Sequence, residues 1–261
     1  MEVKNLKIER TNVLGVGISA INLPMALEVL DDRIKRREPT YVCITGVHGV
    51  MESQTDPELR RIHNQAGLVT PDGMPMVWMS RLAGHKHVDR VYGPDLMLAV
   101  CEVSLQKGYR HFLYGGNEGV PELLRDKLQR RFPGLQVVGT YSPPFRPLTP
   151  EEDAAIVAQI NAAQPDIVWV GLSTPKQERW MAAHLGKVQA PVMVGVGAAF
   201  DFHAGLKPQA PRWMQRSGME WFFRMVSEPK RLARRYLHNN PRFVIAVLMQ
   251  LLGLRRYKLD I

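Results

Sequence analysis

The 261-residue sequence has only two cysteines, Cys43 and Cys101, and both lie inside apolar runs. Two such cysteines cannot form a disulfide scaffold, and their scarcity indicates a reducing compartment. The sequence also lacks an uninterrupted apolar run of the roughly 18–20 residues that a membrane-spanning helix requires. Its N-terminal stretch alternates charged and apolar side chains and has no apolar core of a signal peptide. These absences predict a cytoplasmic protein that is soluble or attached to a membrane surface.

Several catalytic motifs are missing as well. No cysteine and histidine residues have the spacing of zinc ligands, and no Asp-x-Asp pair occurs. A G-x-S-x-G nucleophile elbow and a Walker phosphate-binding loop are also absent. The hydrolase and Walker-loop classes therefore lose their main support, and the sequence predicts neither a bound metal ion nor an organic cofactor.

What is present is an alternation of strands and helices over the first two hundred residues. Apolar runs of strand length occupy 12–18, 40–45, 68–70, 110–116, 135–141, 166–172 and 190–197. Helical patterns occupy 23–36, 56–66, 95–107, 118–131, 150–163 and 175–185. Several runs are apolar throughout, as strands buried on both faces of a parallel sheet must be. The alternation predicts an α/β fold with a mostly parallel sheet sandwiched by helices.

The positive charge is concentrated at the end of the chain. Residues 207–261 hold 12 Lys or Arg against three acidic residues, so this segment carries the whole net charge of +9. Such asymmetry indicates a polyanionic partner: a nucleic acid, an anionic lipid surface or a phosphate-bearing ligand. A short apolar stretch between Arg242 and Arg255 suits a core or interfacial helix and is too short to span a bilayer. We expect two domains, 1–205 and a basic helical segment 206–261.

Polar residues that directly follow strands are the candidates for a site, because ligands of such sheets bind at the carboxyl ends of the strands. His48, Asp72, Gln177 and Asp201 all occupy such positions. Each also has a structural alternative. Asp72 can serve as a turn former and Gln177 as a helix cap. His48 can be a hydrogen-bonded structural histidine, and Asp201 a helix cap or the partner of an ion pair.

A glycine-rich segment near the N-terminus has two interpretations. Gly15-Val16-Gly17-Ile18-Ser19-Ala20 fits the dinucleotide-binding pattern G-x-G-x-x-G/A and follows a predicted strand. No acidic residue ends the next strand, 40–45, to bind a ribose hydroxyl. Small residues that close a strand are therefore the favoured interpretation.

Several blocks of the sequence, taken together, resemble one family. The blocks VTPDGMPMVW, RVYGPDLM, HFLYGG and PDIVWVGLSTPKQERWM occur in this order and precede a long block from GVGAAFDFHAG to ARRY. In order and spacing they resemble the WecG/TagA/CpsF family of bacterial glycosyltransferases, from about residue 10 to about residue 238. The resemblance implies a Rossmann-like catalytic domain and a C-terminal helical appendage that binds the membrane and helps to complete the active site.

The resemblance also implies an activity. It predicts an inverting, metal-independent enzyme that transfers a hexose or N-acetylhexosamine from a UDP-sugar. The predicted acceptor is a sugar on a polyprenyl diphosphate at the cytoplasmic face of the bacterial inner membrane, where the enzyme is peripherally attached to an anionic lipid surface. The oligomeric state stays open, with a homo-oligomer among the alternatives.

By position, the resemblance assigns roles to seven residues. The catalytic base falls on Asp72, and substrate-binding positions fall on Arg90, Gln177, Asp201, Arg224, Arg231 and Arg234. The three arginines of the appendage are spaced by seven and three, which puts them near one face if a single helix continues past Pro229.

One segment departs from the family pattern. The threonine and asparagine that the family commonly carries after its second strand fall on Ile44 and Gly46. Thr45 or His48 is expected to replace these contacts with substrate. The segments TGVHG and TPDGMP resemble an exopolysaccharide-type subgroup, for which glucose is favoured over N-acetylmannosamine as the donor sugar.

The chemistry of inversion agrees with these residues. Inversion needs a base on the acceptor hydroxyl and neutralisation of charge on the departing UDP. Asp72 meets the first need, and without an Asp-x-Asp pair the cations of the C-terminal segment must meet the second. Two other classes remain. A nucleic-acid-binding protein explains the charge but lacks a recognition motif, and a catalytically inactive, membrane-recruited binding module does not need Asp72.

Overall fold

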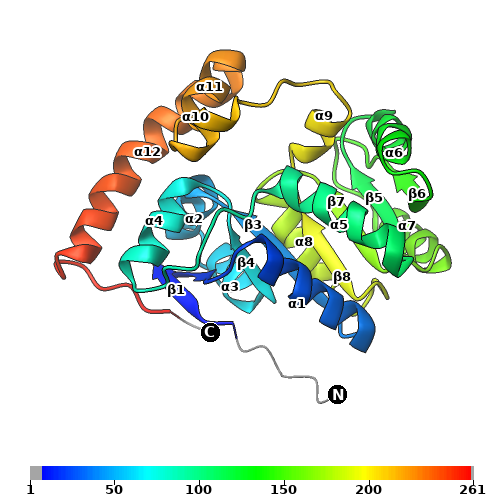
Figure 1. Ribbon diagram of the computed structural model, residues 1–261, viewed down its shortest axis with the longest axis horizontal. Helices are drawn as coiled ribbons and strands as arrows, with labels where there is room; N and C mark the ends of the chain where they lie inside the picture. Colours follow the sequence, from blue (N-terminus) through cyan, green and yellow to red (C-terminus); the bar gives the residue numbers. More distant parts are fainter. Residues whose placement is uncertain (1–7, 260–261) are drawn as a thin grey trace. The chain divides into compact units, whose positions relative to one another are not determined.

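The computed structural model describes residues 8–259, which form two compact units (Figure 1). Among these residues, unit 1 comprises 8–29, 44–92 and 209–259. Unit 2 comprises 30–43 and 93–208. Both units are therefore assembled from segments that lie far apart in the sequence, and each is considered by itself below.

Unit 1 contains two antiparallel strands, one short strand and most of the helices at the two ends of the chain. Its elements are β1 (Arg10–Val13), β2 (Val16–Ser19), α2 (Val47–Thr55), α3 (Pro57–Gln65), β4 (Leu68–Pro71), α4 (Met74–Leu82), α10 (Arg212–Arg216), α11 (Glu220–Ser227) and α12 (Pro229–Leu251). Helix α1 (Leu23–Arg36) begins in unit 1 and ends in unit 2. Strand β3 (Thr40–Thr45) begins in unit 2 and ends in unit 1.

Unit 2 contains the remaining strands and the helices between them. Its elements are α5 (Gly93–Lys107), β5 (Arg110–Gly115), α6 (Val120–Arg131), β6 (Gln136–Tyr141), α7 (Pro150–Ala162), β7 (Ile167–Gly171), α8 (Lys176–His184), β8 (Val192–Gly195) and α9 (Ala199–His203). Its strands alternate with helices along the chain, as the sequence pattern predicts.

The main sheet has six strands in the order β4-β3-β8-β7-β5-β6. Strand β8 pairs with β3 and β7, and β5 pairs with β7 and β6, all in parallel. In β7 the residues from Ile167 to Val170 are completely buried, which explains why this strand is apolar throughout. The predicted α/β class with a mostly parallel, helix-flanked sheet is confirmed.

The first predicted strand, 12–18, is wrong. The chain forms an antiparallel hairpin there, with Val13 paired to Val16 across a two-residue loop. The loop residues Leu14 and Gly15 have φ angles of 52° and 85°, and positive φ at both positions is the requirement of a type I′ hairpin turn. Because Gly15 turns back into β2 instead of opening a helix, the dinucleotide-binding interpretation of this segment fails.

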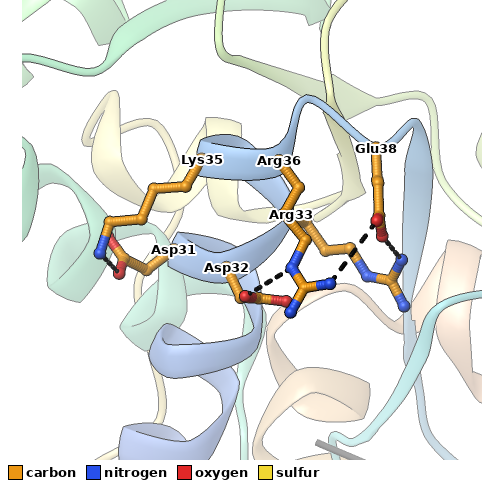
Figure 2. Close-up of polar contacts among 6 residues, drawn as sticks. All are labelled: Asp31, Asp32, Arg33, Lys35, Arg36 and Glu38. Carbon is orange, nitrogen blue, oxygen red and sulfur yellow. Dashed lines mark hydrogen bonds and ion pairs between the residues drawn. The ribbon is translucent and has the colours of Figure 1, made fainter. Parts of the chain in front are cut away.

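The last turn of α1, in unit 2, carries a cluster of ion pairs. Figure 2 shows the side chains involved: Asp31, Asp32, Arg33, Lys35, Arg36 and Glu38. Lys35 pairs with Asp31, and Arg36 pairs with Asp32 at 2.9 Å, both at the i,i+4 spacing of a helix. Basic side chains at a helix C-terminus also interact favourably with the helix dipole. The cluster therefore stabilises the point at which the chain leaves α1 for β3.

Within residues 8–259, no helix combines the length and the apolar character that crossing a membrane requires. The longest helix, α12, has 23 residues and a proline, Pro241, in its interior.

Candidate active site

Asp72 directly follows β4 in unit 1, and backbone hydrogen bonds fix its position. The Asp72 amide donates to the Thr45 carbonyl at 3.2 Å, which links it to the end of β3. The Val91 amide donates to the Pro71 carbonyl at 3.0 Å, which brings the segment before α5 alongside. The Asp72 carboxylate is thus held where two strand ends and a third segment meet, in the kind of position that the sequence predicts for a ligand-binding residue.

Arg90 connects Asp72 to the C-terminal helices of unit 1. Its Nε donates to the Asp72 carbonyl, and its Nη2 lies 3.8 Å from the Asp72 carboxylate. The same Nη2 forms an ion pair with Glu220 of α11, and Nη1 donates to Gln215 Oε1 at 3.4 Å. Burial by itself lowers the pKa of Arg90, but the carboxylates of Asp72 and Glu220 outweigh burial and raise it. The guanidinium therefore stays charged and bridges two acids.

Tyr92 lies beneath this guanidinium. The Arg90 Cζ atom is 4.0 Å from the centroid of the Tyr92 ring, a cation–π contact. Burial, and then the nearby charges of Glu220 and Asp72, raise the pKa of Tyr92 far above its usual value. Tyr92 is therefore a neutral phenol at any physiological pH.

Arg224 of α11 belongs to the same cluster. Burial opposes its charge, whereas electrostatic interactions with acidic groups that include Tyr236, Tyr92 and Glu220 raise its pKa above the usual value. Asp72 contributes to this rise. Two of the residues predicted from the sequence, Asp72 and Arg224, are therefore electrostatic neighbours within unit 1, although 152 positions separate them in the chain.

Arg231 and Arg234 lie in α12, whereas Arg224 lies in α11. The chain breaks between α11 and α12 at Glu228, so the condition of one continuous helix past Pro229 is not met, and the sequence spacing no longer places the three arginines on one face. Proline lacks an amide hydrogen and suits the first turn of a new helix, which explains the break. Arg231 and Arg234 are exposed, and Arg231 forms a two-pronged ion pair with Glu228 at 2.7 and 2.8 Å.

The segment after β3, which departs from the family pattern, lies beside Asp72. A Cβ atom built on Gly46 would lie 3.6 Å from Asp72 Oδ2, so the glycine leaves open a space that a side chain would fill. Thr45 is buried, and its hydroxyl has no hydrogen-bond partner within the part of the chain that is described. His48 lies in α2, where its Nδ1 is 3.2 Å from Asn239 Nδ2 of α12 and 3.5 Å from Glu52. These contacts agree with the alternative interpretation of His48 as a hydrogen-bonded structural histidine.

Gln177 and Glu178 form a separate, buried polar group in unit 2. Both belong to the first turn of α8, and they expose 3% and 0% of their surface. Glu178 Oε1 accepts hydrogen bonds from Thr174 Oγ1 at 2.8 Å and from Gln177 Nε2 at 3.0 Å. Burial raises the pKa of Glu178. The Gln177 carboxamide is packed against the end of β8, where a Cβ atom on Gly195 would lie 3.1 Å from its Cδ.

Asp201 lies in α9 of unit 2 and forms an ion pair with Lys207 Nζ at 2.7 Å. The preceding residue, Phe200, fills the space over β7, because a Cβ atom on Gly171 would lie 2.8 Å from its ring. Of the seven residues assigned through the family resemblance, five therefore lie in unit 1, and Gln177 and Asp201 lie in unit 2.

Among residues 8–259, no three His, Cys, Asp or Glu side chains are grouped in a way that could hold a metal ion. The charged groups of the Asp72 cluster are two carboxylates and guanidinium groups, which suit proton transfer and the binding of anionic oxygen.

Comparison with known proteins identifies the family of this chain. A family model described as "Glycosyl transferase WecG/TagA/CpsF family" matches residues 11–257. The chain belongs to this family. The match covers nearly the whole chain and confirms the resemblance found in the sequence, and it makes the chain a glycosyltransferase.

Three curated relatives of the WecG/TagA/CpsF chain share one name, N-acetylglucosaminyldiphosphoundecaprenol N-acetyl-beta-D-mannosaminyltransferase. The Bacillus subtilis (strain 168) protein is 31% identical over 188 residues, which cover 72% of this chain and 70% of the relative. The Bacillus spizizenii (strain ATCC 23059 / NRRL B-14472 / W23) protein is 30% identical over 197 residues, or 76% and 74% of the two chains. The Staphylococcus aureus (strain MW2) protein is 29% identical over 171 residues, or 66% and 65%.

Four polar residues of these clusters were not among the sequence-based candidates: Tyr92, Glu178, Gln215 and Glu220. Glu178 and Tyr92 lie inside blocks that carry the family resemblance, close to Gln177 and Arg90, so their position in the chain is a usable signal. Glu220 and Gln215 lie within a basic segment, and nothing in the sequence links them to Arg90.

Proposed function

We propose that this glycosyltransferase inverts the anomeric centre of a UDP-hexose or UDP-N-acetylhexosamine and transfers the sugar to a polyprenyl-diphosphate-linked sugar in the synthesis of a cell-surface polysaccharide. The observation that carries the proposal is the Asp72 carboxylate 3.8 Å from the Arg90 guanidinium. Asp72 also contributes to the raised pKa of Arg224 of α11. A base and cations in one cluster meet both needs of an inverting transfer.

The proposed reaction is a single displacement. The acceptor hydroxyl oxygen forms a bond to the anomeric carbon, the bond from that carbon to the UDP oxygen breaks, and Asp72 takes the proton of the hydroxyl. Arg224, Arg231 and Arg234 offset the charge that develops on UDP, and Thr45, His48, Arg90, Gln177 and Asp201 contact the substrates. Guanidinium groups suit this task because they stay charged and present several donors to phosphate oxygens.

The proposed class of acceptor is taken from the names of the relatives. Their name describes an acceptor in which N-acetylglucosamine is joined to undecaprenol through a diphosphate, and a donor that supplies N-acetylmannosamine. A polyprenyl-diphosphate-linked sugar is therefore the proposed acceptor here. For the donor, glucose remains the expectation from the TGVHG segment, and N-acetylmannosamine is its competitor.

The first prediction concerns activity without metal. With radiolabelled UDP-glucose and UDP-N-acetylmannosamine, and an acceptor that carries a sugar on a short polyprenyl diphosphate, we expect a labelled lipid product at the same rate in excess EDTA. The reason is that arginines, in place of a divalent cation, offset the charge of the leaving diphosphate. Loss of the product in EDTA, with recovery on adding Mg²⁺ or Mn²⁺, would contradict metal independence. Failure with every UDP-sugar tested would favour the inactive binding module.

The C-terminal part of unit 1 offers a surface for the membrane. Exposed apolar side chains along α12 and just after it are Leu237, Val244, Ile245, Leu248, Met249, Leu251, Leu252 and Leu254. Exposed basic residues flank them, among them Arg242, Arg255 and Arg256. Basic side chains contribute about 1 kcal/mol each near an anionic surface, and apolar side chains add interfacial burial. We propose that this surface attaches the enzyme peripherally to the cytoplasmic face of the inner membrane.

The second prediction tests this attachment. Ile245→Asp with Leu248→Asp is expected to abolish co-sedimentation with vesicles that contain phosphatidylglycerol, because two exposed apolar side chains become charged. Leu123→Asp with Leu185→Asp, at exposed positions of unit 2, is the matched control and should sediment like the unmodified protein. Binding should weaken as salt is added. These replacements are preferable to truncation after Gly205, since Leu232 and Phe243 of α12 are buried within unit 1.

A further inference from the structure

One buried hydroxyl in the Asp72 cluster has no hydrogen-bond partner anywhere in residues 8–259. Tyr92 exposes 5% of its surface, and its phenolic oxygen is enclosed without a donor or acceptor from that part of the chain. A buried hydroxyl without a partner lowers stability, because it has given up its hydrogen bonds with water. A phenylalanine ring would fill the same volume without this cost. The hydroxyl therefore points to a partner outside residues 8–259.

The Tyr92 ring is held firmly next to Asp72. The Val91 amide donates to the carbonyl of Pro71, the residue before Asp72, and the Val91 carbonyl accepts from Thr70 Oγ1 at 3.2 Å. On its face, the ring carries the Arg90 guanidinium at 4.0 Å. Backbone bonds on one side and a cation on the other leave the phenol in one orientation.

Four charged groups act on the hydroxyl. Glu220 and Asp72 favour its protonated form, Arg224 and Arg90 oppose it, and burial, the largest influence, keeps it protonated. A phenol in this state donates a hydrogen bond and does not take a proton. Its partner is therefore an oxygen that accepts a hydrogen bond, held among carboxylates and guanidinium groups.

We propose that the Tyr92 hydroxyl is a substrate-binding group that donates a hydrogen bond to a ligand oxygen beside Asp72. Two ligand oxygens have this chemistry: a phosphate oxygen of the nucleoside diphosphate and a hydroxyl of the acceptor sugar. The inference rests on the proposed transfer reaction, because that reaction brings both ligands to Asp72.

The third prediction is a comparison of two hydroxyl deletions. Tyr92→Phe keeps the ring and its contact with Arg90 and removes only the oxygen that has no hydrogen-bond partner in the described part of the chain. We expect its melting temperature to equal or exceed that of the unmodified protein, and its transfer rate at low substrate concentration to fall about tenfold, the worth of one hydrogen bond. Tyr109→Phe is the matched control, because Tyr109 donates to Asp31 in unit 2. It should melt a few degrees lower and transfer normally.

Two titrations identify the ligand oxygen. A weaker dissociation constant for UDP in Tyr92→Phe, measured by calorimetry, assigns the phosphate, and an unchanged UDP constant with a raised acceptor KM assigns the sugar hydroxyl. A lower melting temperature for Tyr92→Phe would overturn the proposal without reference to activity, since it would reveal a protein partner. Normal UDP affinity and normal acceptor KM would also overturn it while the transfer reaction stands. An unmodified protein that neither binds UDP nor transfers sugar would overturn both.

Discussion

Asp72→Asn is expected to lower sugar transfer by about 10²–10⁴-fold, the usual contribution of a general base. The change keeps the size of the side chain and removes its basicity. The Asp72 backbone amide and carbonyl, which bond Thr45 and Arg90, are untouched. The fold of the loop should therefore survive, and UDP affinity should stay close to that of the unmodified protein. The comparison of transfer rate with UDP affinity, by product formation and calorimetry, separates the chemical step from binding.

Asp201→Asn is the matched control for this change. It removes a carboxylate of the same size that forms an ion pair with Lys207 in unit 2. We expect it to affect substrate binding more than the chemical step, so its loss of transfer should diminish at saturating substrate. Near-normal turnover by Asp72→Asn would show that Asp72 is not the general base and would assign that role to Asp201 or His48.

The sequence was a good guide wherever a local pattern decides the structure. Strand β7 was predicted because a strand buried on both faces must be apolar, and all of Ile167–Val170 is buried. The break between α11 and α12 also has a local cause, because proline ends one helix and begins another. Asp72 was singled out because it follows a strand of an α/β sheet, and the structure holds it there beside a guanidinium.

The failures have equally physical causes. The run from 13 to 18 contains only apolar residues and glycine, and periodicity does not reveal that Leu14 adopts a positive φ and reverses the chain. The Glu220 partner of Arg90 lies 130 positions away, beyond any spacing rule. The spacing of Arg224, Arg231 and Arg234 predicts a common face only for a continuous helix, and Pro229 starts a new helix, so that condition is not met.

Arg90→Met is expected to lower the free energy of unfolding by about 3–5 kcal/mol, the range for removing one member of a buried ion pair. The side chains of Arg90 and Glu220 each expose only 13% of their surface, so solvent screens them little. Without the guanidinium, the Glu220 carboxylate keeps its burial and loses its ion pair with Arg90. The Asp72 carbonyl and Gln215 Oε1 lose a donor as well. Urea unfolding, followed by tryptophan fluorescence, measures the loss.

A second replacement separates the ion pair from the other contacts of Arg90. In Arg90→Met with Glu220→Leu the more buried of the two carboxylates that faced Arg90 is gone, so we expect much of the lost stability to return, because an apolar pair of similar volume often equals a buried salt bridge. Transfer should not return, since the cation beside Asp72 is still missing. Arg146→Met, which breaks an exposed pair with Glu152, is the control and should leave the urea midpoint nearly unchanged. An Arg90→Met protein as stable as the control would show that the bridge from Asp72 to α11 does not hold unit 1 together.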